Sequence, residues 1–271
     1  MSVITINYNN AAGLEKTMRS VAEQEPCSFE FIVIDGNSND GSKEVIKKFQ
    51  KNIHYHISEK DNGIYDAQNK GLAQANGSYI IFMNSGDAFH NKTTLSSFEK
   101  EFSGSNKKII YGDTKIIHAN GSGEMLKPPA KLNNEFWYAR TLNHQAVFTH
   151  ASVFKELGNF STHFRYASDF ELMLKTYLKY PEEFLYYPNT ICDFDNTGLT
   201  SSDSVHKAIL EERKIILKAN FSRKEYQRIR KIYLSSLPAK KRWEYVARDN
   251  KTIRTVLKPV YKTLKKLRPK K

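Results

Sequence analysis

Three aspartates, Asp35, Asp61 and Asp87, each follow an apolar run with the composition of a β-strand. The carboxyl ends of parallel strands meet at one edge of a sheet, so we expect the three carboxylates to converge there. Like charges repel each other unless a cation or hydrogen-bond donors hold them. A hard divalent cation that also binds substrate phosphates is the usual arrangement. The alternative is that each aspartate only makes a turn or caps a helix.

The elements that must position these residues alternate between strand and helix patterns. Such alternation predicts βαβ units and a mostly parallel sheet, which is an α/β fold. The expected strands are residues 3–6, 29–34, 53–57 and 79–83, with helices around residues 14–21, 45–49 and 64–75.

From about residue 105 the pattern becomes mixed and completes the same domain. Gly112 and Asp113 are expected to join two strands, and residues 121–129 are expected to form a loop. The remaining predictions are strands at 108–111, 114–118, 185–187 and 190–194, and helices at 152–157, at 169–179 and within 207–235.

Size and composition are those of a globular protein with a substantial core. The chain has 271 residues, of which 39% are hydrophobic, and only two cysteines, Cys27 and Cys192. A disulfide framework or a zinc site is therefore not expected, and a reducing setting fits best. No basic segment followed by a long apolar run opens the chain, so we expect no signal peptide. No run approaches the ~18 apolar residues that a membrane span requires.

Charge is distributed unevenly along the chain. Residues 1–203 contain 20 Lys and Arg against 24 Asp and Glu, a net charge of −4, whereas residues 204–271 contain 22 against 5, a net charge of +17. Within residues 251–267, apolar and basic positions alternate at helical spacing, and Pro259 would kink or split that helix. A basic amphipathic helix suits an anionic membrane surface, although it could also pack on the body of the protein or on a second subunit.

The sequence resembles the inverting glycosyltransferases of family 2, which have the GT-A fold, over roughly residues 1–200. The likeness lies in four segments that occur in the family's order: residues 5–9 (TINYN), 31–42 (FIVIDGNSNDGS), 58–71 (SEKDNGIYDAQNKG) and 82–87 (FMNSGD). It is closest to the branch that builds bacterial capsular polysaccharide, exopolysaccharide or O-antigen units. The resemblance implies a GT-A domain at residues 1–203, followed by a basic helical region at residues 204–271.

The resemblance also implies roles on the donor side. Tyr8 and Asn10 would lie against the nucleotide. Asp35 would bind the base or the ribose. Asp61 and Asn69 would contact the nucleotide or the sugar of the donor.

The segment Asn84-Ser85-Gly86-Asp87 occupies the place of the family's DxD-type motif, which holds Mg²⁺ or Mn²⁺ against the donor diphosphate. Such a cation neutralises the charge that develops on the leaving nucleoside diphosphate. The sequence departs from the pattern, since Asn84 and Gly86 stand where acidic residues are usual. Asp87 is then the expected metal ligand, with Asn84, Ser85 and Gly86 beside the donor. Whether this altered motif still requires a metal is left open.

Asp169 matches the aspartate that serves as the catalytic base in the family, although Ser168 replaces the glutamate that often precedes it. A general base must lie within hydrogen-bond reach of the proton it removes. The alternative is that Asp169 caps its helix, and Glu171 is the reserve candidate for the base. His144 and Gln145 precede an apolar strand and are either structural or in contact with the acceptor or another substrate.

The implied activity is inverting transfer of a sugar, from a UDP-sugar by first choice, to a hydroxyl of a lipid-linked saccharide. The enzyme would act in the cytoplasm, attached peripherally to the inner face of the plasma membrane through its basic C-terminal region. A nucleotidyltransferase is the alternative enzyme, but residues 7–13 (NYNNAAG) lack the basic, glycine-rich phosphate loop that it would need. An inactive adaptor that binds membranes or nucleic acid is the non-enzymatic alternative, although no nucleic-acid-binding motif is present.

Overall fold

A computed structural model describes residues 1–197, 203–238 and 241–242. These residues group into two compact units. The first consists of residues 1–132 and 141–216, and the second of residues 133–140 together with the described residues from 217 onwards. The division predicted after residue 203 did not foresee that residues 133–140 belong with the C-terminal region. The amphipathic pattern of residues 251–267 lies outside the described residues.

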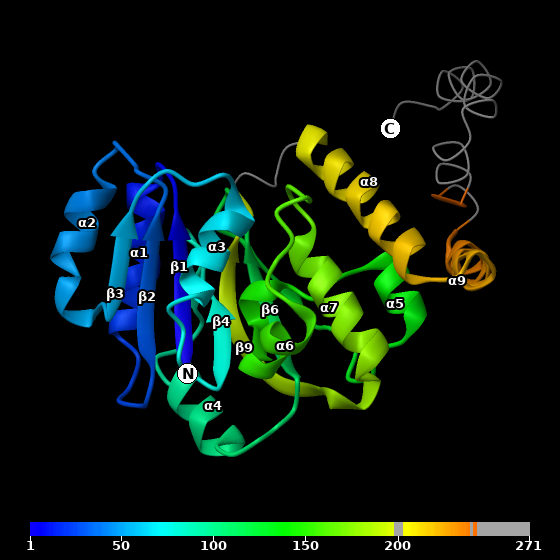
Figure 1. Cartoon of the computed structure of the whole chain (residues 1–271), viewed down its shortest axis with the longest axis horizontal. Helices are drawn as coiled ribbons and strands as arrows, with labels where there is room; N and C mark the ends of the chain where they lie inside the picture. The colour runs from blue at the N-terminus through cyan, green and yellow to red at the C-terminus, as the bar shows by residue number, and fades with distance from the viewer. Residues whose placement is uncertain (198–202, 239–240, 243–271) are drawn as a thin grey trace. The chain divides into compact units, whose positions relative to one another are not determined.

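The first unit is built on one mixed sheet of nine strands (Figure 1). Its order is β3-β2-β1-β4-β8-β6-β9-β5, and β7 pairs with β6 beside this path. The strands are β1 (Ser2–Asn7), β2 (Glu30–Asp35), β3 (Tyr55–Ser58), β4 (Tyr79–Phe82), β5 (Ala88–Phe89), β6 (Ile109–Ile117), β7 (Gly123–Leu126), β8 (Val147–His150) and β9 (Phe184–Asp195). The first four strands pair in parallel, as the βαβ pattern predicted, and antiparallel pairs enter with β5, β7 and β8.

Helices cover both faces of this sheet because successive strand residues point to opposite sides. Val3 packs in one buried cluster with residues of helices α1, α2 and α4, whereas Ile4 packs in the other with residues of α3, α6 and α7. In Figure 1, α3, α6 and α7 lie in front of the sheet and α1 lies behind it. The helices of this unit up to β9 are α1 (Ala11–Ala22), α2 (Ser42–Lys48), α3 (Ile64–Leu72), α4 (Thr94–Phe102), α6 (Ala151–Leu157) and α7 (Ser168–Lys179), with the short 3₁₀ turns η1 (Gln50–Asn52), η2 (His144–Ala146) and η3 (Pro181–Glu183).

Three predictions in the mixed half were wrong. Gly112 and Asp113 do not turn the chain: β6 continues through them, and its parallel pairing with β9 shifts register there. A Cβ on Gly112 would lie 2.6 Å from the carbonyl oxygen of Asn189, so glycine permits this close approach. In the same way β9 is one strand where two were predicted. Within the loop predicted for residues 121–129, residues 123–126 form β7.

The second unit contains α5 (Asn134–Ala139) and α9 (Arg223–Ser236), which pack on each other. Arg228 pairs with Glu225 at 2.8 Å and with Glu135 at 3.4 Å, and the Tyr138 ring contacts the ring of Tyr226. Helix α8 (Asp203–Asn220) begins in the first unit and ends in the second. Among the described residues, no helix is long and apolar enough to span a membrane.

Candidate active site

The carboxyl ends of β1, β2 and β3 place Asn7, Asp35 and Ser58 side by side in register. Asp35 is fully buried and accepts hydrogen bonds from Asn7 Nδ2 (2.8 Å) and from Ser58 Oγ (2.6 Å), and also from both the backbone and the hydroxyl of Ser38. Burial alone would raise the pKa of Asp35, but these donors outweigh it and the pKa lies below its ordinary value. The carboxylate has no exposed surface, and the contact of Asp35 with base or ribose stays a prediction. Its role is to hold the loop after β2.

Tyr8 and Asp61 meet over Gly36, the first residue after β2. A Cβ on Gly36 would lie 3.0 Å from both Tyr8 Cδ2 and Asp61 Oδ2, so the absent side chain permits this approach. Tyr8 is 67% exposed, which leaves its ring open to a ligand. Lys70 lies 2.7 Å from Asp61 Oδ1; burial raises the pKa of Asp61, and Lys70 opposes that rise. An aromatic face beside a carboxylate and an ammonium group suits a nucleobase.

Asn10 and Asn69 were both predicted to contact the donor, and the structure engages both side chains within the protein. Asn10 Oδ1 caps α1 by accepting from the Gly13 amide (3.1 Å), and its Nδ2 donates to the Ser85 carbonyl (3.3 Å). Asn69 donates to the Phe160 carbonyl (2.8 Å) and accepts from the Phe160 amide (3.0 Å). Both ends of the Asn69 amide therefore brace α3, and its contact with the donor stays a prediction.

The polar turn of residues 84–87 follows β4 and packs against α1. Gly86 has a φ of +105°, which favours glycine. The Thr17 hydroxyl accepts from the Gly86 amide (3.0 Å) and lies 2.6 Å from the Asp87 carbonyl. Ser85 Oγ donates to Asn7 Oδ1 (2.8 Å), and Lys16 Nζ donates to the Gly86 carbonyl (2.6 Å). The turn is thus held from both sides.

Asp87, the expected metal ligand, is nearly buried, at 4% exposure. Gln145 Nε2 donates to its Oδ2 (2.8 Å), and the Asp195 amide donates to its Oδ1 (2.9 Å). Burial raises the pKa of Asp87 to about 6, although both hydrogen bonds oppose the rise. The carboxylate therefore links the turn to η2 and to the end of β9.

Asp195 is a residue that the sequence did not single out. Its Oδ1 accepts from the amide (2.9 Å) and the hydroxyl (2.6 Å) of Thr197. Its Oδ2 would lie 3.6 Å from a Cβ on Gly86. A carboxylate from β9 thus stands next to the position where the family usually has an acidic side chain.

A divalent cation fits this corner only with ligands from outside the protein. Among the described residues, no three His, Cys, Asp or Glu side chains come together as a metal site. Asp195 offers one carboxylate oxygen beside the turn, and the nearly buried Asp87 offers the lone pairs that its two donors leave. Mg²⁺ commonly binds through one or two carboxylates, water and substrate phosphates, so the donor set is compatible with a metal that arrives with a diphosphate.

A second cluster forms around Asp169 at the start of α7. Tyr65 Oη donates to Asp169 Oδ1 (2.8 Å), and His144 Nδ1 lies 3.3 Å from Oδ2. The other ring nitrogen of His144 lies 3.0 Å from Asn84 Nδ2. Burial would raise the pKa of Asp169, but His144 and Tyr65 outweigh it and the pKa lies below its ordinary value. Glu171, the reserve candidate, instead pairs with Lys175 at 2.7 Å.

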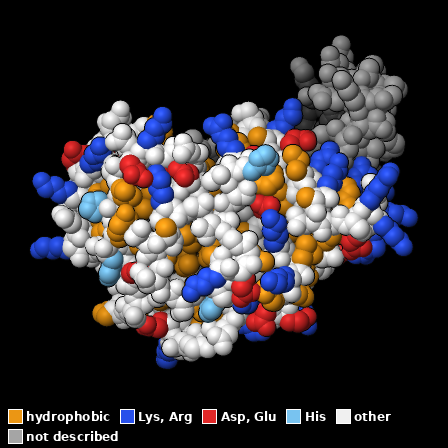
Figure 2. All heavy atoms as spheres, viewed as in Figure 1, with side chains coloured by type: hydrophobic (Ala, Val, Ile, Leu, Met, Phe, Trp, Pro, Cys, Tyr) orange, Lys and Arg blue, Asp and Glu red, His pale blue; other side chains and the backbone are white. Residues whose placement is uncertain are grey.

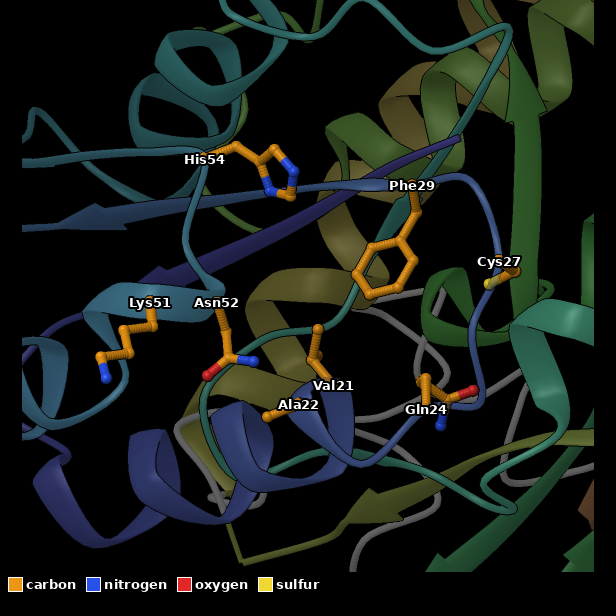
Figure 3. A pocket seen from close by; sticks show the side chains of 8 residues that line it. All are labelled: Val21, Ala22, Gln24, Cys27, Phe29, Lys51, Asn52 and His54. Atoms are coloured by element: carbon orange, nitrogen blue, oxygen red, sulfur yellow. The ribbon is translucent and has the colours of Figure 1, made fainter.

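Figure 3 shows a pocket of about 370 Å³ at the opposite end of the strands. Phe29 and His54, which line it, precede β2 and β3, whereas the candidate site follows the ends of these strands. Cys27 also lines the pocket, and burial raises the pKa of its thiol, which disfavours the reactive thiolate. No predicted site residue lies there.

Comparison with known proteins identifies the family of this chain. Residues 2–163 match the model of glycosyl transferase family 2. An uncharacterized glycosyltransferase of Mycobacterium tuberculosis is 31% identical over 207 residues, which cover 74% of this chain and 77% of that protein.

Two solved structures share the fold. S. aureus TarS 1–349 in complex with UDP-GlcNAc aligns with a TM-score of 0.65 at 19% identity, covering 86% of this chain and 71% of that one. The mannosyltransferase PcManGT from Pyrobaculum calidifontis, in complex with GDP-Man and Mn²⁺, aligns with a TM-score of 0.58 at 17% identity, covering 94% and 81%. This chain therefore has a GT-A-like fold, belongs to glycosyl transferase family 2 and is a glycosyltransferase.

Proposed function

We propose that the protein transfers a sugar from a nucleoside-diphosphate sugar to an acceptor hydroxyl, with inversion and with Asp169 as general base. The observation that carries this proposal is the hydrogen-bonded carboxylate of Asp169, next to His144 and the turn that begins at Asn84. Tyr65 and His144 stabilise its ionised form, which is the form able to accept a proton.

The step is a single displacement. The acceptor oxygen attacks the anomeric carbon while its proton moves to the carboxylate of Asp169. The bond between the anomeric carbon and the phosphate oxygen breaks, and the nucleoside diphosphate leaves with the bonding electrons. One displacement on the face opposite the leaving group inverts the anomeric configuration.

The donor we propose is a UDP-sugar. Tyr8 provides an exposed ring on which the base can stack, and Asp61 can accept a hydrogen bond from N3–H of uracil. A structural neighbour binds UDP-GlcNAc and another binds GDP-Man. These complexes support a nucleotide-sugar donor, and the choice of uracil is our inference from the chemistry of Tyr8 and Asp61.

We propose Mg²⁺ or Mn²⁺ as the cofactor, held by Asp195 and Asp87 with the donor diphosphate. When bound, the cation would neutralise charge on the leaving diphosphate. The Mn²⁺-bound neighbour and the half-buried Asp195 carboxylate beside Gly86 support this proposal. Lys16 adds a positive charge at the back of the same turn.

Calorimetric titration of the full-length protein with UDP, GDP and dTDP, first with Mn²⁺ and then with EDTA, tests the donor and metal proposals. UDP should bind most tightly, and EDTA should weaken its binding at least tenfold. Asp195→Asn should remove most of the effect of Mn²⁺ on UDP affinity. Asp193→Asn is the matched control, because Asp193 pairs with His90 at 2.6 Å and lies outside the site. Equal affinity with and without EDTA would refute the metal proposal while leaving the nucleotide site intact.

The acceptor we propose is a lipid-linked saccharide of a bacterial surface polysaccharide, reached from the cytoplasmic face of the plasma membrane. The support is the basic composition of residues 204–271, with 22 Lys and Arg against 5 Asp and Glu. Each basic residue near an anionic surface adds about 1 kcal/mol of binding free energy. In Figure 2, Lys and Arg side chains are prominent at the right of the view, where Figure 1 places α9.

Sedimentation with lipid vesicles tests the membrane proposal. The protein should bind vesicles that contain phosphatidylglycerol and should not bind pure phosphatidylcholine vesicles. Replacing Lys251, Arg254, Lys258 and Lys262 with Gln should reduce binding. The matched control replaces the four lysines of residues 43–51. Equal loss in both variants would show a general charge effect and refute a dedicated surface.

A further inference from the structure

His144 has a polar partner at each nitrogen of its ring. Nδ1 faces Asp169 Oδ2 at 3.3 Å, and Nε2 faces Asn84 Nδ2 at 3.0 Å. These partners come from α7 and from the turn after β4, whereas His144 itself opens η2. The imidazole therefore bridges two elements that the sequence separates by 85 residues, Asn84 and Asp169.

The partners determine which nitrogen carries the proton. The amide nitrogen of Asn84 can only donate, so Nε2 must accept and Nδ1–H must point to Asp169. Asn84 Oδ1 is buried and has no hydrogen-bond partner. If the amide is turned over, this oxygen accepts from a protonated Nε2. In that second arrangement Nδ1 also carries a proton only if the ring is doubly protonated, so a neutral His144 donates to the Asp169 carboxylate only in the first arrangement.

Asp169 is faced by groups from two other elements. Tyr65 from α3 donates to Oδ1, and burial together with the charge of Asp169 raises the pKa of the Tyr65 hydroxyl well above its ordinary value. His144 from η2 lies against the other oxygen, Oδ2. It also acts to lower the pKa of Asp87. The Asp169 side chain is 17% exposed, so a small part of it can meet an acceptor.

We propose that His144 is a positioning residue that aims the carboxylate of Asp169 and ties it to the turn beginning at Asn84. The base and the donor side of the site would then keep a constant separation. The inference rests on the proposed function for the role of Asp169 as base. It assigns His144 a role other than the direct substrate contact considered from the sequence, since both ring nitrogens already have partners.

Two substitutions of His144 by an amide side chain test its contacts with Asp169 and with Asn84 separately. In His144→Asn the amide nitrogen can take the place of Nδ1 and keep the donor to Asp169. In His144→Gln the amide oxygen can take the place of Nε2 and accept from Asn84 Nδ2, so the bond to Asn84 can persist and Asp169 loses its donor. Both variants keep a polar side chain of similar size, which limits the effect on folding, and thermal unfolding checks that both fold.

The first readout is the pKa of Asp169 itself, from carboxyl ¹³C NMR of the ligand-free, full-length protein. The signal is assigned by its absence in Asp169→Asn. His144→Gln should raise the pKa of Asp169 by about one pH unit, as expected for a lost hydrogen bond to a charged group. His144→Asn should leave it within about half that amount. The same pKa in His144→Gln and in the wild type would overturn the proposal.

The second readout is the pH profile of kcat for sugar transfer. His144→Gln should move the acid limb to higher pH by the same amount and lower kcat about tenfold. The KM for the donor should stay within about twofold, and His144→Asn should restore most of the rate. A shifted Asp169 pKa in a protein that transfers no sugar would uphold the positioning role and refute the proposed function. An unshifted Asp169 pKa in an active enzyme would refute the positioning role and uphold the proposed function.

Discussion

Two consecutive residues of η2 contact two different carboxylates, Asp87 and Asp169. Gln145 donates to Asp87, and His144 lies against Asp169. Burial raises the pKa of Asp87 to about 6, whereas the partners of Asp169 outweigh burial and lower its pKa. Asp87 receives two neutral amide donors, while Asp169 receives a hydroxyl and an imidazole that can carry charge. The nature of the donors, more than the depth of burial, distinguishes the carboxylate proposed to bind the metal from the carboxylate proposed to accept a proton.

The largest expected effect comes from removing the carboxylate of Asp169. Asp169→Asn should lower kcat by roughly 10³-fold or more, because the amide cannot take the acceptor proton. UDP affinity should stay within about twofold, since Asp169 is not part of the Tyr8–Asp61 corner. Steady-state kinetics and calorimetry on the same preparation measure both quantities. Full activity in this variant would remove Asp169 from the role of base.

The next effect is on the pH dependence of the free energy of unfolding, to which Asp87 and Asp169 should contribute with opposite signs. The folded pKa of Asp87, about 6, lies above its ordinary value of 3.8. Its contribution to the free energy of unfolding is therefore fully present below about pH 3.8 and is lost as the pH rises through 6, a loss of roughly 3 kcal/mol. The stability advantage of the wild type over Asp87→Asn should thus shrink between pH 4 and pH 7, as measured by urea unfolding in EDTA.

Asp169→Asn is the matched control for that series. The folded pKa of Asp169 is lowered, so its stabilising contribution is present above the unfolded pKa and is lost as the pH falls through the folded value. The two difference curves should slope in opposite directions. Parallel slopes would contradict the assignment of different roles to the two carboxylates.

The smallest effect should follow from Tyr65→Phe, which removes the hydroxyl that donates to Asp169 Oδ1. The pKa of Asp169 should rise, and the acid limb of the kcat profile should move to higher pH, with kcat reduced about threefold to tenfold. Tyr79→Phe is the control, because the Tyr79 hydroxyl donates to the Lys107 carbonyl. An unchanged acid limb in Tyr65→Phe would leave His144 as the only side chain that tunes the base.

The parallel half of the sheet was predictable because its strands and helices have regular periods and its strands end at polar residues. This pattern pointed to Asp87 after β4, whereas Asp169, at the start of α7, was predicted from the family resemblance. The GT-A-like fold and the family, expected from the four motifs, were confirmed by the structural and sequence comparisons. The lipid-linked acceptor and the metal stay proposals.

Residue types alone did not reveal how deeply a side chain is buried or which groups it contacts. Asp35 and Asn69 were predicted to touch the donor, yet neighbouring serines and backbone groups use their polar atoms. Asp195 was missed because nothing in its sequence neighbourhood marks a site. It comes beside Gly86 only because β9 pairs with both β5 and β6. Likewise, Gly112 was interpreted as part of a turn. The local sequence at a shift of strand register cannot be distinguished from the local sequence of a turn.

The hydrogen bond from the Asp195 amide to Asp87 joins residues 108 positions apart, and the bond between Tyr65 and Asp169 spans 104. Contacts of such long range require closure of large loops and form slowly during folding. The βαβ units before residue 84 can assemble from local contacts, but Asp87 gains its Asp195 partner only after β9 has joined the sheet. Nascent chains that lack β9 can therefore bury much of the parallel core while still lacking the carboxylate that β9 brings to the polar turn, so we expect the proposed metal corner to be completed only at the end of folding of the first unit.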